Sequence, residues 1–233
     1  MAETPLTDSI EALTTYANQT TGASDTNLSD AVYTLARGYG GGGQEVPAEY
    51  DELLGIYFTS TNLINTGYTW NADTEIKLVA ERGPGMHAFA NIVQATNFYI
   101  GYGTANAIYY KIGSEAEKSL LVQSYPVLLT ATINGLSADY FDSGNTQGQV
   151  AVSDTTVTTT GEVVIGGIDS RPWHGTLYLF EVLENNVKIA RMIPAKRKSD
   201  NVVGLYDVIR HAFYTDSTGN GFTALTYGDM HLS

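Results

Sequence analysis

The sequence predicts an all-β protein in which two antiparallel sheets pack face to face, preceded by a short helical segment. Polar and apolar side chains alternate in several stretches after Val46, and turn motifs separate those stretches. A helical spacing of apolar residues is confined to the part of the chain before Val46. A chain of 233 residues has room for one large sandwich and a small appendage.

Residues 1–37 contain two similar segments in which apolar residues recur at intervals of three and four. This spacing places the apolar side chains on one face of a helix. Helices this short are marginal in water, so we predict a helical hairpin whose apolar faces need a partner surface. These residues are Leu6, Ile10 and Leu13 in the first segment and Leu28, Val32 and Leu35 in the second.

Residues 38–45 form a predicted linker, because glycine at this density fixes no backbone conformation. The glycines do not match a phosphate-binding loop, since no Gly-Lys-Ser/Thr motif follows them. The linker therefore separates the helical element from a second domain, residues 46–233.

The second domain has the pattern of strands. Residues 74–81, 106–112 and 187–193 alternate between polar and apolar side chains, as half-buried strands do. Residues 127–133 and 163–165 are more uniformly apolar and β-branched, which favours strands in the middle of a sandwich. Turn motifs lie at residues 83–85, 134–135, 142–145, 160–161, 185–186 and 217–221.

The charge of the chain limits its partners. Twenty-five acidic residues against twelve basic ones give a formal net charge of -13, which disfavours binding to nucleic acid and to anionic membranes. No apolar run approaches the roughly 20 residues of a membrane span. The one basic run, residues 196–198, is interpreted as a solvated turn, with a phosphate or glycan-sulfate contact as the alternative.

The sequence contains no pattern typical of a catalytic or metal centre. The four histidines are far apart, with no metal-ligand spacing around them. Glu75 and Glu81 share one side of a predicted strand, but the residues between them indicate a solvent face. Glu181 and Glu184 cannot both face inward in regular β geometry. We therefore predict neither an enzyme nor a metal site.

Binding through the rim or a face of the sandwich is the more plausible function. Exposed aromatic rings stack on sugars, and neighbouring amides and carboxylates hydrogen-bond to sugar hydroxyls. Candidate glycan-binding residues of these types are Trp70, Asn97, Tyr102, Asp169 and Trp173. The alternative is that the two tryptophans fill the core, as aromatic residues in strands usually do.

The C-terminal third carries a more specific pattern, at residues 173–182, 192–200, 203–207, 212–216 and 219–224. It resembles the closing strands of concanavalin-like, laminin-G-like jelly rolls found in tail, fibre and decoration proteins of bacteriophages and prophages. The resemblance extends upstream to residues 50–53, 60–61 and 64–68 and so spans roughly residues 46 to 226. It implies a jelly-roll domain over residues 46–233.

The N-terminal helical segment is similar to one found at the head of many phage-encoded proteins, before different C-terminal modules. The resemblance implies an element that attaches a cargo domain to other virion proteins. The alternative is a hairpin that packs against its own jelly roll. We expect a homo-oligomer, and a trimer in particular, because weak single sites then act together. The expected location is the virion, after synthesis in the cytoplasm of the bacterial host.

Some laminin-G-like relatives hold calcium at the rim, so the resemblance makes Asp169, or alternatively Asp139 and Asp142, candidate ligands. No Asp-x-Asp-x-Asp array is present, and no other cofactor is expected. The function implied is structural display and adhesion to host or environmental glycans, by a head-fibre, decoration or tail-associated protein. Two alternatives are a purely architectural capsid or tail component without a ligand, and a glycoside hydrolase of lectin-like fold.

Overall fold

The computed structural model describes most of the chain that follows the predicted linker. It covers residues 45–59, 61–83, 90–103, 106–123, 125–140, 145–152, 161–167 and 172–225. The chain divides into two compact units, Met1–Glu45 and Val46–Ser233. The linker up to residue 44 lies outside the described residues, as do the apolar residues of the predicted helices, Leu6, Ile10, Leu13, Leu28, Val32 and Leu35.

All regular secondary structure in the described residues is β-strand, which confirms the predicted all-β class. No helix in this part of the chain is long and apolar enough to cross a membrane. The strands are β1 (Tyr50–Glu52), β2 (Gly55–Phe58), β3 (Ile64–Thr69), β4 (Thr74–Arg82), β5 (Ala90–Ala95), β6 (Phe98–Tyr102), β7 (Ala107–Ile112), β8 (Lys118–Leu121), β9 (Val127–Thr132), β10 (Gly135–Tyr140), β11 (Thr146–Ala151), β12 (Glu162–Ile165), β13 (Gly175–Glu184), β14 (Val187–Arg197), β15 (Val203–Asp207), β16 (Ala212–Thr215) and β17 (Thr223–Leu225).

The larger of two antiparallel sheets follows the order β11-β10-β9-β4-β13-β14-β15-β16. On one side, β13 pairs with β4 along its length. Its other side is shared, because β2 pairs with residues 175–177 and β14 pairs with residues 180–184. The short β17 pairs with β2, so segments from opposite ends of the described chain lie side by side next to β13.

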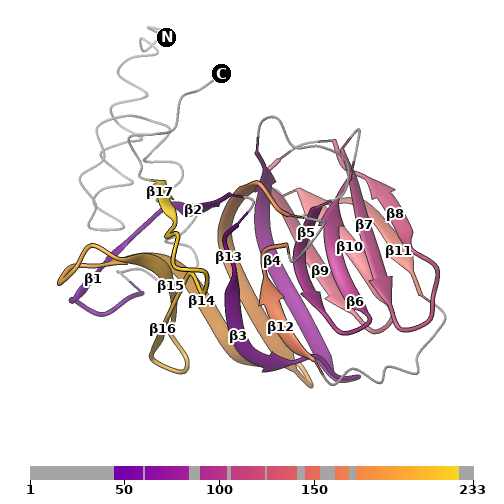
Figure 1. The fold of residues 1–233 in the computed structure, drawn as a ribbon. Coiled ribbons are helices and arrows are strands. Elements are labelled where there is room, and N and C mark those ends of the chain that lie inside the picture. Colours follow the sequence, from indigo (N-terminus) through magenta and orange to yellow (C-terminus); the bar gives the residue numbers. More distant parts are fainter. Residues whose placement is uncertain are drawn as a thin grey trace, which may run out of the picture. The chain divides into compact units, whose positions relative to one another are not determined.

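The smaller sheet has the order β3-β12-β5-β6-β7-β8 and faces the larger one (Figure 1). Buried side chains from both sheets belong to one apolar core. Trp70, just after β3, stacks on Phe98 of β6 with ring centroids 4.0 Å apart, and Trp173 packs on Phe58 of β2 at 4.7 Å. The two sheets therefore form a sandwich around these rings.

Alternation of side chains explains why these segments form strands. In β3, Ile64, Thr66 and Tyr68 are buried while the residues between them are exposed. The predicted strands at residues 74–81 and 187–193 are present, and the second continues to Arg197.

The strand β14 separates two apolar clusters. Ala190 and Met192 face the main core, whereas Ile193 and Ala195 belong to a smaller cluster with Val46 and Tyr206. Because successive side chains of a strand point to opposite faces, the smaller cluster lies on the outer face of the large sheet.

The basic run differs from the prediction in its secondary structure. Lys196 and Arg197 are the last residues of β14, and only Lys198 lies in a turn. Both lysines have Asp51 within 4 Å, at 3.8 Å and 3.4 Å. Arg197 Nη2 lies 2.7 Å from Asp200 Oδ2. Acidic neighbours thus surround the run at the surface.

A buried polar contact links the two sheets at Tyr68 of β3. Its hydroxyl donates to Asp207 Oδ2 at 2.7 Å, and Asp207 ends β15 of the other sheet. The Arg210 guanidinium lies 3.6 Å from the centroid of the Tyr68 ring. Burial of the hydroxyl and its hydrogen bond to Asp207 raise the pKa of Tyr68 above its usual value. The phenol therefore remains protonated and continues to donate.

We expect Tyr68→Phe to lower the free energy of unfolding by about 1–3 kcal/mol, because the buried Asp207 carboxylate loses a donor. Tyr140→Phe is the matched control, since the Tyr140 hydroxyl donates to Gln123 Oε1 in an exposed position. That change should cost less than about 0.5 kcal/mol. Urea unfolding of both variants measures the difference, and equal costs would show that the inter-sheet contact contributes little.

Candidate functional site

Four residues form a row across adjacent strands of the large sheet. Thr176 of β13 pairs with Glu81 of β4 on one side and with Tyr57 of β2 on the other. Tyr57 in turn pairs with Thr223 of β17. Directly paired residues share one face of a sheet, so all four side chains lie on the same side.

The neighbouring row shows which side this is. Leu177 pairs with Ala80 and with Ile56, and all three are fully buried in the main core. Because side chains alternate between the two faces of a sheet, the row of Glu81, Thr176, Tyr57 and Thr223 lies on the outer face.

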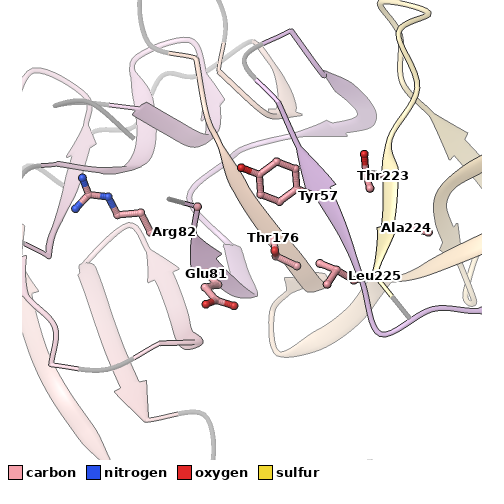
Figure 2. Close-up of a pocket in the computed structure, with 8 residues that line it drawn as sticks. Tyr57, Glu81, Arg82, Thr176, Thr223, Ala224 and Leu225 are labelled. Atoms are coloured by element: carbon pink, nitrogen blue, oxygen red, sulfur yellow. The ribbon is translucent and has the colours of Figure 1, made fainter. Parts of the chain in front are cut away.

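A groove of about 420 Å³ runs along this row. Figure 2 shows Tyr57 and Thr176 in the middle, Glu81 and Arg82 on one side, and Thr223, Ala224 and Leu225 on the other. The Arg82 guanidinium extends away from the other labelled side chains. The groove thus combines an aromatic ring, two threonine hydroxyls and a carboxylate.

An irregularity in β13 adds a second tyrosine beside the groove. The pairing between β13 and β4 shifts between Leu177 and Leu179, which leaves Tyr178 as the extra residue of a β-bulge. The Tyr178 hydroxyl donates to Glu81 Oε2 at 2.5 Å. This bond holds the carboxylate against the outer face of the sheet.

Two glycines make room for these side chains. A Cβ at Gly55 would come within 2.7 Å of Thr176 Cγ2 and 3.3 Å of the Tyr178 ring. At Gly83, a Cβ would lie 2.7 Å from the Tyr57 hydroxyl and 3.1 Å from a backbone oxygen. A larger residue at Gly55 would press on Thr176 and Tyr178, and a larger residue at Gly83 would displace the Tyr57 hydroxyl.

The groove offers types of side chain that are able to contact a sugar. A ring offers a stacking surface, while hydroxyl and carboxylate oxygens are suited to sugar hydroxyls. Acid–base catalysis on a glycosidic bond needs two carboxyl groups about 5–9.5 Å apart. Glu75, on the same side of β4, is six residues from Glu81, or about 20 Å along a strand. These two carboxylates do not form such a pair.

A second hollow, of about 440 Å³, lies along β9, β10 and β11 of the same sheet. Its lining includes Thr130, Ser137 and Gln149 and contains no aromatic side chain. It offers hydrogen bonds without a stacking surface, so the groove at Tyr57 is the better candidate.

The structure places three of the predicted glycan-binding residues inside the sandwich. Trp70, Trp173 and Tyr102 are at most 1 % exposed. A ring enclosed on both faces cannot stack on a sugar, so these three side chains act as core residues. Burial raises the pKa of the Tyr102 hydroxyl and raises that of its ring neighbour Tyr125 to about 12.

Of the two remaining predicted residues, the structure describes one, and that one lies apart from these rings. Asn97 is exposed in the turn before β6, with a φ of 59°. Tyr102 is at the other end of β6, about 16 Å away along the strand. Asp169 lies outside the described residues.

The calcium hypothesis concerns three aspartates, of which the structure describes one. Asp139 lies in β10, and Asp142 and Asp169 are outside the described residues. Within the part of the chain that is described, no group of three or more His, Asp or Glu side chains is arranged to hold a metal ion.

Tyr57, Thr176 and Thr223 were not among the predicted site residues, and Glu81 was predicted to lie on the solvent face of a strand rather than in a binding site. Alternation alone places Tyr57 and Thr176 on the opposite side from their buried neighbours. The sequence does not show the register that aligns β4, β13, β2 and β17.

A comparison with protein-family models gives no match, and neither does a comparison with curated proteins.

Proposed function

We propose that this chain is a structural protein of a bacteriophage or prophage particle that displays a jelly-roll sandwich for adhesion to host or environmental glycans. The motifs of the C-terminal third and the two-sheet architecture of the described residues support this proposal. The N-terminal segment would attach the chain to other virion proteins, and a trimer would raise the avidity of weak single sites.

The groove on the outer face of the large sheet is the main support for the proposed adhesion to glycans. Tyr57 supplies the stacking ring, and Glu81 is held in place by Tyr178. The net charge of -13 opposes the approach of sulfated or otherwise polyanionic glycans. Neutral glycans are therefore the proposed ligands.

A glycan array probed with the full-length chain tests this proposal. We expect binding to a subset of neutral glycans. Tyr57→Ala should weaken that binding at least about tenfold, because about 1.4 kcal/mol of stacking is lost. Tyr57→Phe keeps the ring and should retain most of it. Ser137→Ala, in the hollow without aromatic side chains, is the control for unrelated surface changes.

Two outcomes would contradict the proposal. If the folded, oligomeric chain bound no glycan, the architectural alternative would be favoured. If glycans were bound but also cleaved, the hydrolase alternative would be favoured. The virion location is tested separately, by detecting the chain with antibodies on intact particles and finding its position by cryo-electron microscopy.

A further inference from the structure

The outer face of the small sheet also carries two tyrosines. Tyr99 of β6 and Tyr109 of β7 are half-buried, whereas Ile100, Ile108 and Tyr110 beside them are fully buried in the main core. Since side chains alternate along each strand, Tyr99 and Tyr109 lie on the face that is turned away from the large sheet.

The Tyr109 ring covers bare backbone at Gly103. A Cβ at Gly103 would lie 1.7 Å from Tyr109 Cε2 and 2.6 Å from Cδ2, so no residue other than glycine leaves room for the ring there. Gly101, which is paired with Tyr109, has no side chain on this face either. The ring is therefore supported by backbone and forms a platform on the sheet.

A pair of amides lies next to this platform. Asn91 of β5 is paired with Gly101, and Gln94 of β5 is paired with Tyr99. Asn91 Nδ2 donates to Gln94 Oε1 at 2.7 Å. Gln94 Nε2 is buried and makes no hydrogen bond to any residue that the structure describes. A buried donor without an acceptor is costly, and a ligand hydroxyl would satisfy it once the partly exposed Gln94 side chain turns outward.

The charges on this face balance each other locally. Lys111 is paired with Tyr99, and the Tyr99 hydroxyl donates to the Glu117 carboxylate. Neither sign of charge dominates, and the chain as a whole is strongly acidic. An uncharged ligand with a flat apolar face and several hydroxyls matches a ring and two amides on a face that carries charges of both signs.

We propose that the outer face of β5, β6 and β7 is a second saccharide-binding site, in which a neutral pyranose stacks on Tyr109 and hydrogen-bonds to the amides of Asn91 and Gln94. This inference rests on the proposed adhesive function but not on the groove at Tyr57. The two sites lie on the outer faces of opposite sheets, so one chain contacts two glycan strands at once. Paired contacts of this kind multiply weak affinities through effective concentration.

Binding of the full-length chain to linear neutral oligosaccharides of glucose, galactose, mannose and N-acetylglucosamine tests the second site. We compare Tyr109→Ala and Tyr109→Phe, each in the Tyr57→Ala background, by isothermal titration calorimetry. Tyr109→Ala should weaken the remaining binding at least about tenfold, and Tyr109→Phe less than about threefold. The melting temperature of each variant shows whether it folds.

Two further variants test the second saccharide-binding site even if Tyr109→Ala fails to fold. Gln94→Leu removes the orphan donor, and we expect it to weaken binding. Gly103→Ala should do the same, because the new Cβ displaces the Tyr109 ring. If Tyr57→Ala alone abolishes all binding, or if the second-site variants bind as well as their background, the second site is wrong and the proposed function stands. If the unaltered chain binds none of these sugars, both proposals fail.

Discussion

Trp70→Ala is expected to lower the free energy of unfolding by about 3–5 kcal/mol, the largest effect of any single change considered for this chain. The side chain is 0 % exposed and stacks on Phe98 between the two sheets. Truncation to alanine removes the transfer free energy of the indole and leaves a cavity that the surrounding strands cannot fill. Urea or thermal unfolding of the purified variant gives the value.

The same experiment separates the two interpretations of Trp70 that the sequence left open. A glycan-binding ring at the surface would change stability by less than about 0.5 kcal/mol on truncation. Leu121→Ala is the matched control for such a surface change, because Leu121 is 67 % exposed. If the Trp70 and Leu121 variants were equally stable, the core position of Trp70 would be contradicted.

The second large effect is expected at Asp216, which follows β16 and is 8 % exposed. Its two carboxylate oxygens accept hydrogen bonds from the backbone amides of Leu63, Thr218, Asn220 and Gly221 and from the side chains of Asn62 and Thr218. These bonds fix the turn that leads into β17 and join it to the segment before β3. Since β17 forms one side of the groove, Asp216 also positions the candidate site.

Asp216→Asn should lower the free energy of unfolding by about 2–4 kcal/mol, because an amide group cannot accept all of these hydrogen bonds. Asp139→Asn is the matched control. The Ser137 hydroxyl lies 3.5 Å from Asp139 Oδ2, which is a long contact for a hydrogen bond. Replacement of Asp139 should therefore cost less than about 0.5 kcal/mol. Loss of glycan binding in the Asp216 variant at a temperature where it is still folded would show that the turn also supports the groove.

The contribution of Asp216 depends on pH. Burial opposes ionisation of the carboxylate, but hydrogen bonds from Leu63, Asn62 and Thr218 outweigh it and hold the pKa below its ordinary value of 3.8. A depressed pKa in the folded state stabilises the protein above pH 3.8, and this stabilisation is lost as the pH falls through the folded-state value. The stability difference between the unaltered chain and Asp216→Asn should therefore narrow below pH 3.8. A difference that stays constant from pH 7 to pH 3 would contradict this cause.

The strand pattern was predictable from the sequence because burial follows the two-residue period of each strand. Residues 127–133 and 74–81 were predicted as strands, and the structure has β9 and β4 there. Sheet order was not predictable, since strands such as β4 and β13 are about 100 residues apart and their pairing is set by tertiary packing.

The candidate groove was not predictable for two physical reasons. Its row of side chains exists only in one register of four strands, and a shift by a single residue would turn each side chain to the other face. In addition, the bulge at Tyr178 breaks the alternation of β13, so the sequence gives no sign that Tyr178 and Glu81 meet. Residue type alone made Trp70 and Trp173 candidates for stacking on a sugar. Their large apolar rings are instead more stable in the core, where both are buried.

The most direct test of the account is a crystal structure of the full-length chain with a neutral oligosaccharide selected on the array. We predict sugar density on the outer face of the large sheet, with a pyranose ring against Tyr57 and a hydroxyl within hydrogen-bond distance of Glu81. Density confined to a loop at the end of the sandwich, or a sugar between the two sheets, would contradict the claim that the sheet faces bind the ligand.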